Sequence, residues 1–209
     1  KSKAIENGLR DERMGPLTLF QPCKTCGLKK PKCPGHFGHI ELIKPVYHIS
    51  WITQIIYWLR CICVDCGSNL IKDLSEPDLC RNKHLTYYSK NANKKCPSCN
   101  LKQPKYSWHK KSGKILKGKQ VYPIESVLKH LESIDNDVLS LLAMSHPKDM
   151  ILTCIPVPPP HVRPPIMNGS IIRGEDDITY RLIQIMRCNK KLEKAIKTKR
   201  PEHIIYSIH

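Results

Sequence analysis

Apolar residues recur at helical spacing in three stretches of the chain. In the segment 45–60 they lie three or four residues apart, on one face of a helix, at Ile49, Ile52, Ile56 and Leu59. Pro45 suits the first turn of this helix, because the backbone N–H that proline lacks would have no partner there. The pattern therefore predicts a helix with one buried face over 45–60.

Two further helices are predicted in the second half of the chain. One covers about 125–143, with an apolar face of Leu128, Leu131, Ile134 and Val138. The other starts near Glu175, and its buried face is expected to hold Ile178, Leu182, Ile185, Leu192 and Ile196. The helix dipole is positive at the N-terminus, where acidic residues are favourable, and negative at the C-terminus, where basic residues are favourable. The sequence has Glu175, Asp176 and Asp177 at the first end and Lys190, Lys191, Lys194 and Lys197 towards the second. Pro201 should end it.

The segment between these two helices predicts a strand followed by a proline-rich strap. Ile151–Val157 has the composition of a short buried strand, and six prolines follow between Pro156 and Pro165. Each proline fixes φ and removes a backbone donor, so we expect an extended strap packed on the domain rather than a loose linker. Its P-x-x-P spacing also permits a ligand for an SH3-type domain. Asn168-Gly169 indicates a turn.

These elements together predict an α+β fold, irregular, with helices and short strands. No stretch approaches the roughly 18 apolar residues of a membrane-spanning helix, so no membrane contact is expected. The chain begins at Lys1 without a Met or an apolar signal core, which suggests a fragment or a processed protein.

Charge is concentrated in one part of the sequence. The formal net charge is +17, yet residues 79–124 contain 12 Lys and Arg and no Asp or Glu. A solvated lysine-rich loop is one interpretation. The other is a surface that faces nucleic acid, with Tyr106 and Trp108 interleaved among the lysines to stack on bases.

A compact group of potential metal ligands lies near the N-terminus. Cys23, Cys26, Cys33 and His36 follow the spacing C-x2-C-x6-C-x2-H, and four such donors can close a tetrahedron around Zn²⁺. Gly27 and Gly35 permit the tight backbone that this requires. His39 is a rival for the fourth ligand, although the C-x2-H spacing favours His36.

Two further C-x2-C pairs form a second candidate set. They are Cys63 and Cys66, then Cys96 and Cys99. Cys61 and Cys80 are rivals for these ligand roles, whereas Cys154 and Cys188 are expected in the core. Four available ligands at each set indicate structural zinc, because a catalytic zinc keeps one position open. No nucleophile, phosphate-loop or paired-carboxylate motif occurs, so no catalytic residue is predicted.

Five sequence blocks point to a family. They are GLRDERMG (8–15), CKTCGLKKPKCPGHFGHIELIKPVYH (23–48), CVDCG (63–67), ILTCIPVPPPHVRP (151–164) and RGEDDITYRLIQIMRCN (173–189). The most specific element is CPGHFGHIEL, within the second block. These blocks resemble the N-terminal region of the largest subunit of multisubunit DNA-directed RNA polymerases, and they occur here in the order that the family has. The resemblance is to the eukaryotic, archaeal and large-DNA-virus branch rather than to the bacterial one.

The resemblance implies a clamp, the wall that closes over DNA and the RNA–DNA hybrid during transcription. It implies three segments: 1–62, the clamp core entry with the first zinc set; 63–124, the clamp head with the second; and 125–209, core helices, strap and a lid-like loop around 166–177. Contacts to nucleic acid are expected at Lys110, Lys111 and Lys114 in the basic segment and at Arg173 in the lid-like loop.

The resemblance also sets expectations for the complete enzyme. The N-A-D-F-D-G-D motif that holds Mg²⁺ does not occur in this sequence, so this chain would be part of a nucleotidyltransferase without its catalytic centre. Expected partners are the other polymerase subunits, including the second-largest, template DNA and the hybrid. An intracellular location follows: the nucleus for a cellular protein, the host cytoplasm or the virion for a viral one.

Two other classes of protein remain as alternatives. A free-standing zinc-dependent transcription regulator that binds nucleic acid would account for the charge and the cysteines, but not for the ordered blocks. A RING-type interaction module needs interleaved ligand pairs, whereas the first set here is self-contained. A reading frame that continues past His209 into N-A-D-F-D-G-D would favour the polymerase.

Overall fold

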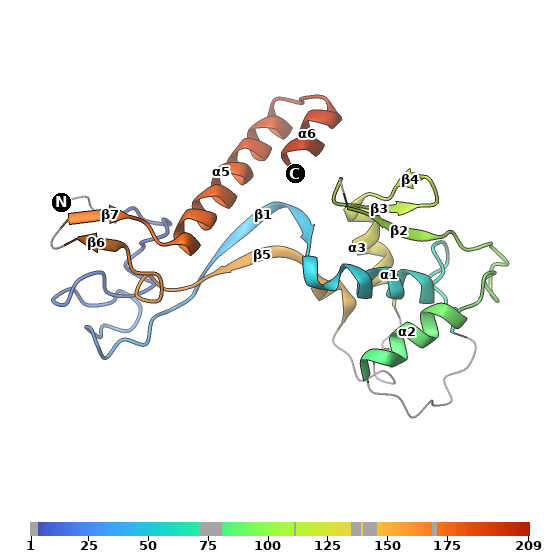
Figure 1. The fold of residues 1–209 in the computed structure, drawn as a ribbon, viewed down its shortest axis with the longest axis horizontal. Helices are drawn as coiled ribbons and strands as arrows, with labels where there is room; N and C mark the ends of the chain where they lie inside the picture. The colour runs from blue at the N-terminus through green and yellow to red at the C-terminus, as the bar shows by residue number, and fades with distance from the viewer. Residues whose placement is uncertain (1–3, 72–80, 111, 135–138, 140–145, 169–170) are drawn as a thin grey trace. The chain divides into compact units, whose positions relative to one another are not determined.

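The computed structural model describes the chain except residues 1–3, 72–80, 111, 135–138, 140–145 and 169–170. It divides into two compact units, unit 1 (1–44 and 153–209) and unit 2 (45–152). The chain leaves unit 1 within β1 (Gly38–Tyr47) and returns within β5 (Ile151–Val157), and these two strands pair with each other (Figure 1). Helices and short strands occur together, which confirms the α+β expectation.

The helix predicted over 45–60 is confirmed in its second half. It comprises η1 (Ile49–Trp51) and α1 (Ile52–Cys61), and α1 buries Ile55 and Trp58 completely. The predicted start is wrong, because Pro45 lies in β1 and Ile49 is 81% exposed. β1 pairs only with β5 among the described residues, and such an edge position tolerates a proline without a donor.

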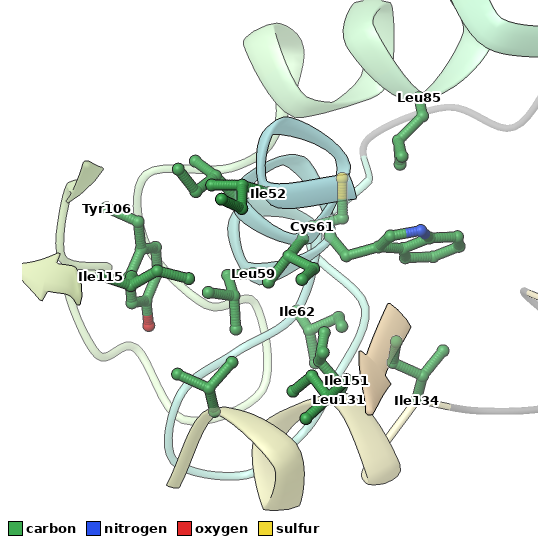
Figure 2. Packing of buried hydrophobic residues seen from close by; sticks show 14 of the residues in the cluster. Ile52, Leu59, Cys61, Ile62, Leu85, Tyr106, Ile115, Leu131, Ile134 and Ile151 are labelled. Atoms are coloured by element: carbon green, nitrogen blue, oxygen red, sulfur yellow. The ribbon is translucent and has the colours of Figure 1, made fainter. Parts of the chain in front are cut away.

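Unit 2 is built around the buried face of α1. Figure 2 shows side chains converging there from α1, α2 (Arg81–Asn91), β3 (Lys114–Lys117) and α3 (Ile124–Glu132). α3 buries Val127 and Leu131. The remainder of the helix predicted over 125–143, including Val138, lies largely outside the described residues. The predicted boundaries at 62 and 124 both fall inside this unit, because α1 and α3 share one core.

The basic segment forms regular structure that the sequence did not predict. It contains α2 and a three-stranded antiparallel sheet of β2 (Tyr106–His109), β3 and β4 (Gln120–Val121), in the order β2-β3-β4. Tyr106 pairs with Lys117, and His109 pairs with Lys114. Ile115 on β3 is completely buried. The loop interpretation of this segment is therefore wrong.

Unit 1 contains the helix predicted to start near Glu175. The N-cap of α5 (Asp177–Lys197) is Asp176, whose carboxylate accepts a hydrogen bond from the Ile178 backbone N–H at 2.9 Å. It ends before Pro201, which precedes α6 (Glu202–Ile208). The predicted apolar face is partly wrong, since Ile178 is 47% exposed and Ile196 37%. The buried residues of α5 are Thr179, Leu182, Leu192 and Ala195.

The proline-rich strap packs on unit 1 through Arg163, which is only 3% exposed. Its guanidinium donates to the carbonyl oxygen of Pro158 at 2.9 Å, to Thr179 Oγ1 at 3.1 Å and to the carbonyl oxygen of Leu9. This arrangement confirms a packed strap. The strap is not extended throughout, because the Val162 N–H donates to the Pro159 carbonyl oxygen at 3.1 Å and the Arg163 N–H to that of Pro160 at 3.3 Å, which closes a turn. After the strap, β6 (Ile166–Asn168) and β7 (Ile171–Gly174) pair antiparallel. The Gly169 half of the predicted turn lies outside the described residues.

The expectation that Cys154 and Cys188 belong to the core is wrong. Both are exposed. β5 buries only its two end residues, Ile151 and Val157, and leaves its middle accessible, because a two-stranded ribbon has little to cover it. None of the helices that the structure describes combines the length and the apolar character needed to cross a bilayer.

Candidate metal centres and basic surface

The first cluster, Cys23, Cys26, Cys33 and His36, is assembled in unit 1. Its four donor atoms all lie within 4.8 Å of one another. Cys26 Sγ is 3.6 Å from Cys33 Sγ, and Cys33 Sγ is 3.7 Å from His36 Nε2. A tetrahedral zinc site predicts separations of about 3.8 Å and about 3.6 Å for these two kinds of pair. The donor geometry therefore fits Zn²⁺.

The structure brings His36, and not His39, to the three cysteines. The His39 ring lies outside the cluster, with Nε2 3.8 Å from the Glu41 carboxylate, and it is 64% exposed. The His36 backbone N–H donates to the Met14 carbonyl oxygen at 2.9 Å, which fixes the chain where the ring enters the cluster.

The strap closes one side of the first cluster. Gly35 has φ +85°, and a Cβ placed there would lie 2.1 Å from the His161 ring. His161 Nε2 is 3.0 Å from the Pro34 carbonyl oxygen, within hydrogen-bonding distance. Glycine is therefore required at position 35 both by the backbone conformation and by the close approach of His161.

The second cluster, Cys63, Cys66, Cys96 and Cys99, is assembled in unit 2. Its four sulfurs also lie within 4.8 Å of one another. Cys63 Sγ is 3.6 Å from Cys99 Sγ, and Cys66 Sγ is 3.5 Å from Cys96 Sγ. These separations are far longer than the roughly 2.05 Å of a disulfide and close to those of a Cys₄ zinc site.

The rival cysteines do not join the second cluster. Cys61 is buried in the core of unit 2, where burial raises its pKa to about 12. A thiol in such surroundings stays protonated, whereas a metal ligand must be a thiolate. Cys80 lies outside the described residues.

Three copies of one turn, here called knuckles, supply the C-x2-C pairs. In each, the N–H of the first cysteine donates to the carbonyl oxygen five residues later, and its own carbonyl accepts the N–H four residues later. The fourth residue after that cysteine has positive φ, a conformation that favours Gly or Asn. The knuckles are Cys23–Leu28, Cys63–Ser68 and Cys96–Leu101, with the positive φ at Gly27, Gly67 and Asn100.

Hydrogen bonds and neighbouring thiols shift the pKa values of cysteines in the second cluster in opposite directions. Hydrogen bonds from the Ser68 hydroxyl and backbone N–H lower the pKa of Cys66 to about 6. The Leu101 N–H lowers the pKa of Cys99, but burial and the neighbouring thiols of Cys63 and Cys96 raise it to about 12. A divalent cation among the sulfurs would offset this repulsion. The donor chemistry therefore fits a soft metal ion.

One supporting residue of the second cluster was not foreseen from the sequence. Gln103 Nε2 donates to Cys63 Sγ at 3.2 Å and to the Leu101 carbonyl oxygen at 3.0 Å. Its Oε1 accepts the Val64 N–H at 3.2 Å. The side chain thus joins the two knuckles of the cluster. No sequence signal marks a glutamine that follows the last ligand by four positions.

His130 on α3 anchors the same cluster to the core. Its Nε2 is 3.3 Å from the Ile62 carbonyl oxygen, next to Cys63. The ring packs among Tyr106 and Tyr122, and burial lowers its pKa to about 4. A neutral His130 therefore donates one hydrogen bond to the chain that enters the first knuckle of the cluster.

The predicted nucleic-acid residues lie in different settings. Lys110 is exposed after β2, and Lys114 is half-buried at the start of β3. Lys111 lies outside the described residues. Arg173 lies in β7, and only its backbone is described.

Base stacking by Tyr106 and Trp108 is not supported. Tyr106 is 2% exposed. Trp108 is half-buried and meets Tyr47 edge-on, with ring centroids 5.8 Å apart. Alternation along β2 places both rings on the face that packs on the core, so the prediction that they stack on bases is wrong.

The sequence of the chain matches known proteins along most of its length. The chain matches the family model described as "RNA polymerase Rpb1, domain 1" over residues 1–208. It is 38% identical to "DNA-directed RNA polymerase subunit Rpo1N" of Sulfolobus acidocaldarius, over 96% of this chain and 25% of that protein. It is 33% identical to the subunit of the same name from Methanothermobacter thermautotrophicus, with the same coverage.

A eukaryotic relative gives the same result. The chain is 33% identical to "DNA-directed RNA polymerase II subunit RPB1" of Euplotoides octocarinatus, over 96% of this chain and 48% of that protein. It spans about a quarter of the length of the archaeal relatives. The chain therefore belongs to the RNA polymerase Rpb1 domain 1 family, the N-terminal region of the largest subunit of DNA-directed RNA polymerases.

Proposed function

We propose that this chain forms the clamp part of the largest subunit of a DNA-directed RNA polymerase, and that it closes over template DNA and the RNA–DNA hybrid. The observation that carries the proposal is the family match along 1–208, and the structure adds two clusters of four metal-donor side chains within the matched residues. In this proposal the complete enzyme is a nucleotidyltransferase. Its catalytic Mg²⁺ is held outside this chain, and the second-largest subunit is among its partners.

Each cluster holds one structural Zn²⁺ in this proposal. Cys23, Cys26, Cys33 and His36 hold the first, and Cys63, Cys66, Cys96 and Cys99 the second. Four protein donors leave no open position for a reacting water. Structural zinc contributes on the order of 10–16 kcal/mol of folding free energy in small modules, which would give a clamp with a small core its rigidity.

Elemental analysis tests the metal content directly. The polymerase assembled with the undamaged full-length subunit should contain two zinc ions in addition to those of its partners and of the rest of the subunit. Mutation of either cluster should remove one of these two ions. Retention of both ions after a ligand is replaced in one cluster would contradict the assignment of that cluster.

The basic segment supports a contact with nucleic acid. It has 12 basic and no acidic residues over 79–124, and binding to phosphates displaces counterions whatever the base sequence. The residues proposed for contact are Lys110, Lys111, Lys114 and Arg173.

The dependence of DNA affinity on salt tests this contact. Each phosphate neutralised on duplex DNA contributes about 0.9 to the slope of log affinity against log salt. Replacing Lys110, Lys111 and Lys114 with Gln in the assembled polymerase should flatten that slope by up to about 2.7. An unchanged slope, with a defect in assembly instead, would assign these lysines to a protein neighbour.

A further inference from the structure

Two lysines face each other at the base of the third knuckle. Lys95 and Lys102 are directly opposite partners in an isolated antiparallel bridge, just outside the Cys96–Leu101 turn. Side chains of such partners project from the same side, with Cβ atoms about 4.5–5.5 Å apart. Both lysines are exposed. The bridge therefore places two exposed lysine side chains directly opposite each other on one surface.

Within the described residues, neither lysine makes an ion pair or a side-chain hydrogen bond. Residues 79–124 contain neither Asp nor Glu. Two more exposed lysines, Lys94 and Lys105, flank the pair in sequence. Like charges directly opposite on a β-bridge are destabilising, so the arrangement costs stability unless an anion offsets it.

The matching position in the other knuckle of the same cluster argues against a purely metal-related role. There the bridge partners are Ile62 and Asn69, which carry no charge. A Zn²⁺ with four thiolates has a net charge of −2, shared by both knuckles. If the lysines only balanced that charge, cations would be expected beside either knuckle. The structure has the pair beside one of them.

We propose that Lys95 and Lys102 form a phosphate-binding site for the backbone of a nucleic acid, with Lys94 and Lys105 adding to the local positive field. This rests on the proposed polymerase function and names a contact separate from Lys110, Lys111 and Lys114. Gln103, next to Lys102, bonds to Cys63 and Val64, and its backbone N–H donates to the Lys94 carbonyl oxygen at 2.8 Å. The second cluster thereby holds the backbone of the bridge in place, so that little conformational freedom is lost on binding.

The contact is to phosphate rather than to bases. A lysine ammonium is a compact point charge that carries no directional code for a base edge. Binding through this site is therefore independent of sequence and sensitive to salt.

The test compares four pairs of substitutions in polymerase assembled with the full-length subunit. They are Lys95→Gln with Lys102→Gln; Lys95→Arg with Lys102→Arg; Lys110→Gln with Lys114→Gln; and, as a matched control, Lys29→Gln with Lys32→Gln, two exposed lysines beside the first cluster. The slope of log affinity against log salt is measured on duplex DNA, together with the zinc content. The single Lys95→Gln and Lys102→Gln variants accompany the first pair.

The first pair should flatten the slope by about 1.8, and each single variant by about 0.9. The zinc content should stay unchanged, the arginine pair should keep the original slope, and so should the control pair. Loss of zinc from the first pair with the slope retained would overturn the proposal and make the lysines part of the metal site. If the slope is unchanged for Lys95→Gln with Lys102→Gln but flattened for Lys110→Gln with Lys114→Gln, the Lys95–Lys102 site alone is overturned. Unchanged slopes for both pairs would overturn the proposed contact of the basic segment as well.

Discussion

At the scale of single residues, the second cluster depends on a side chain that is not a ligand. Gln103 donates a hydrogen bond to the sulfur of Cys63 and accepts one from the Val64 N–H. It thereby links two knuckles that are about thirty residues apart in sequence. Hydrogen bonds from such supporting groups orient ligands and tune the affinity for metal. The same residue would also hold the Lys95–Lys102 bridge in place.

Replacing Gln103 with Leu should weaken the hold of the second cluster on its metal by 10- to 100-fold. The volume is nearly retained, but both hydrogen bonds between the knuckles are lost. The measurement is transfer of zinc to a chelating dye under native conditions. Gln120→Leu, an exposed change on β4 in the same unit, is the control and should release zinc at the original rate. Equal rates for Gln103→Leu and the control would show that the amide does not support the cluster.

A ligand and a bystander cysteine should behave differently. Cys33→Ser removes one donor from the first cluster, and the remaining three groups then surround an underbound metal. Cys154→Ser changes an exposed thiol outside both clusters. Elemental analysis of the polymerase should show the loss of one zinc in Cys33→Ser and none in Cys154→Ser. Equal zinc contents would remove Cys33 from the ligand set.

At the scale of elements, the strap and α5 are held together by one buried cation. Arg163 reaches backbone carbonyls at two distant points of the chain and Thr179 on α5. Burial of its guanidinium lowers the pKa of Arg163, yet an arginine stays charged at any ordinary pH. The hydrogen bonds offset the cost of burying that charge.

Arg163→Met should lower the free energy of unfolding by about 2–3 kcal/mol, because it leaves buried carbonyl groups without a donor. Arg181→Met, an exposed change on α5, should stay within about 0.5 kcal/mol of the original protein. Denaturant unfolding of the full-length subunit, followed by hydrogen exchange of the strap amides, measures both. A loss for Arg163→Met as small as that of Arg181→Met would show that the strap is held by other contacts.

At the scale of the whole molecule, each of the two units contains one cluster of four potential metal donors. The first cluster closes a local loop, from Cys23 to His36. The second joins two knuckles separated by α2 and the residues before it. Closing the longer loop costs more chain entropy, so we expect the second unit to depend more on a metal ion at its cluster.

Chelation should therefore unfold the surroundings of the second cluster before those of the first. The probe is hydrogen exchange in the polymerase during titration with a chelator. The amides of Gly67 and Asn100, which are bonded inside their knuckles, should lose protection at a lower chelator concentration than that of Gly27. Earlier loss at Gly27 would reverse this order.

Features encoded in short stretches could be predicted from the sequence alone. Each C-x2-C pair, the choice of His36 by its spacing, the buried face of α1 and the end of α5 before Pro201 depend on neighbours within a few residues. A C-x2-C pair followed by Gly already contains the turn that presents its two sulfurs. The ordered blocks were likewise sufficient to indicate the family.

Other features were decided only by the tertiary structure, because they depend on which elements meet. Tyr106 looks like a surface aromatic among lysines, but β2 turns it into the core. Cys154 looks like a core residue, but nothing covers the middle of β5. Gln103 gains its partners Cys63 and Val64 only when two knuckles close on one cluster. Burial and pairing between distant segments are set by packing, which local spacing does not encode.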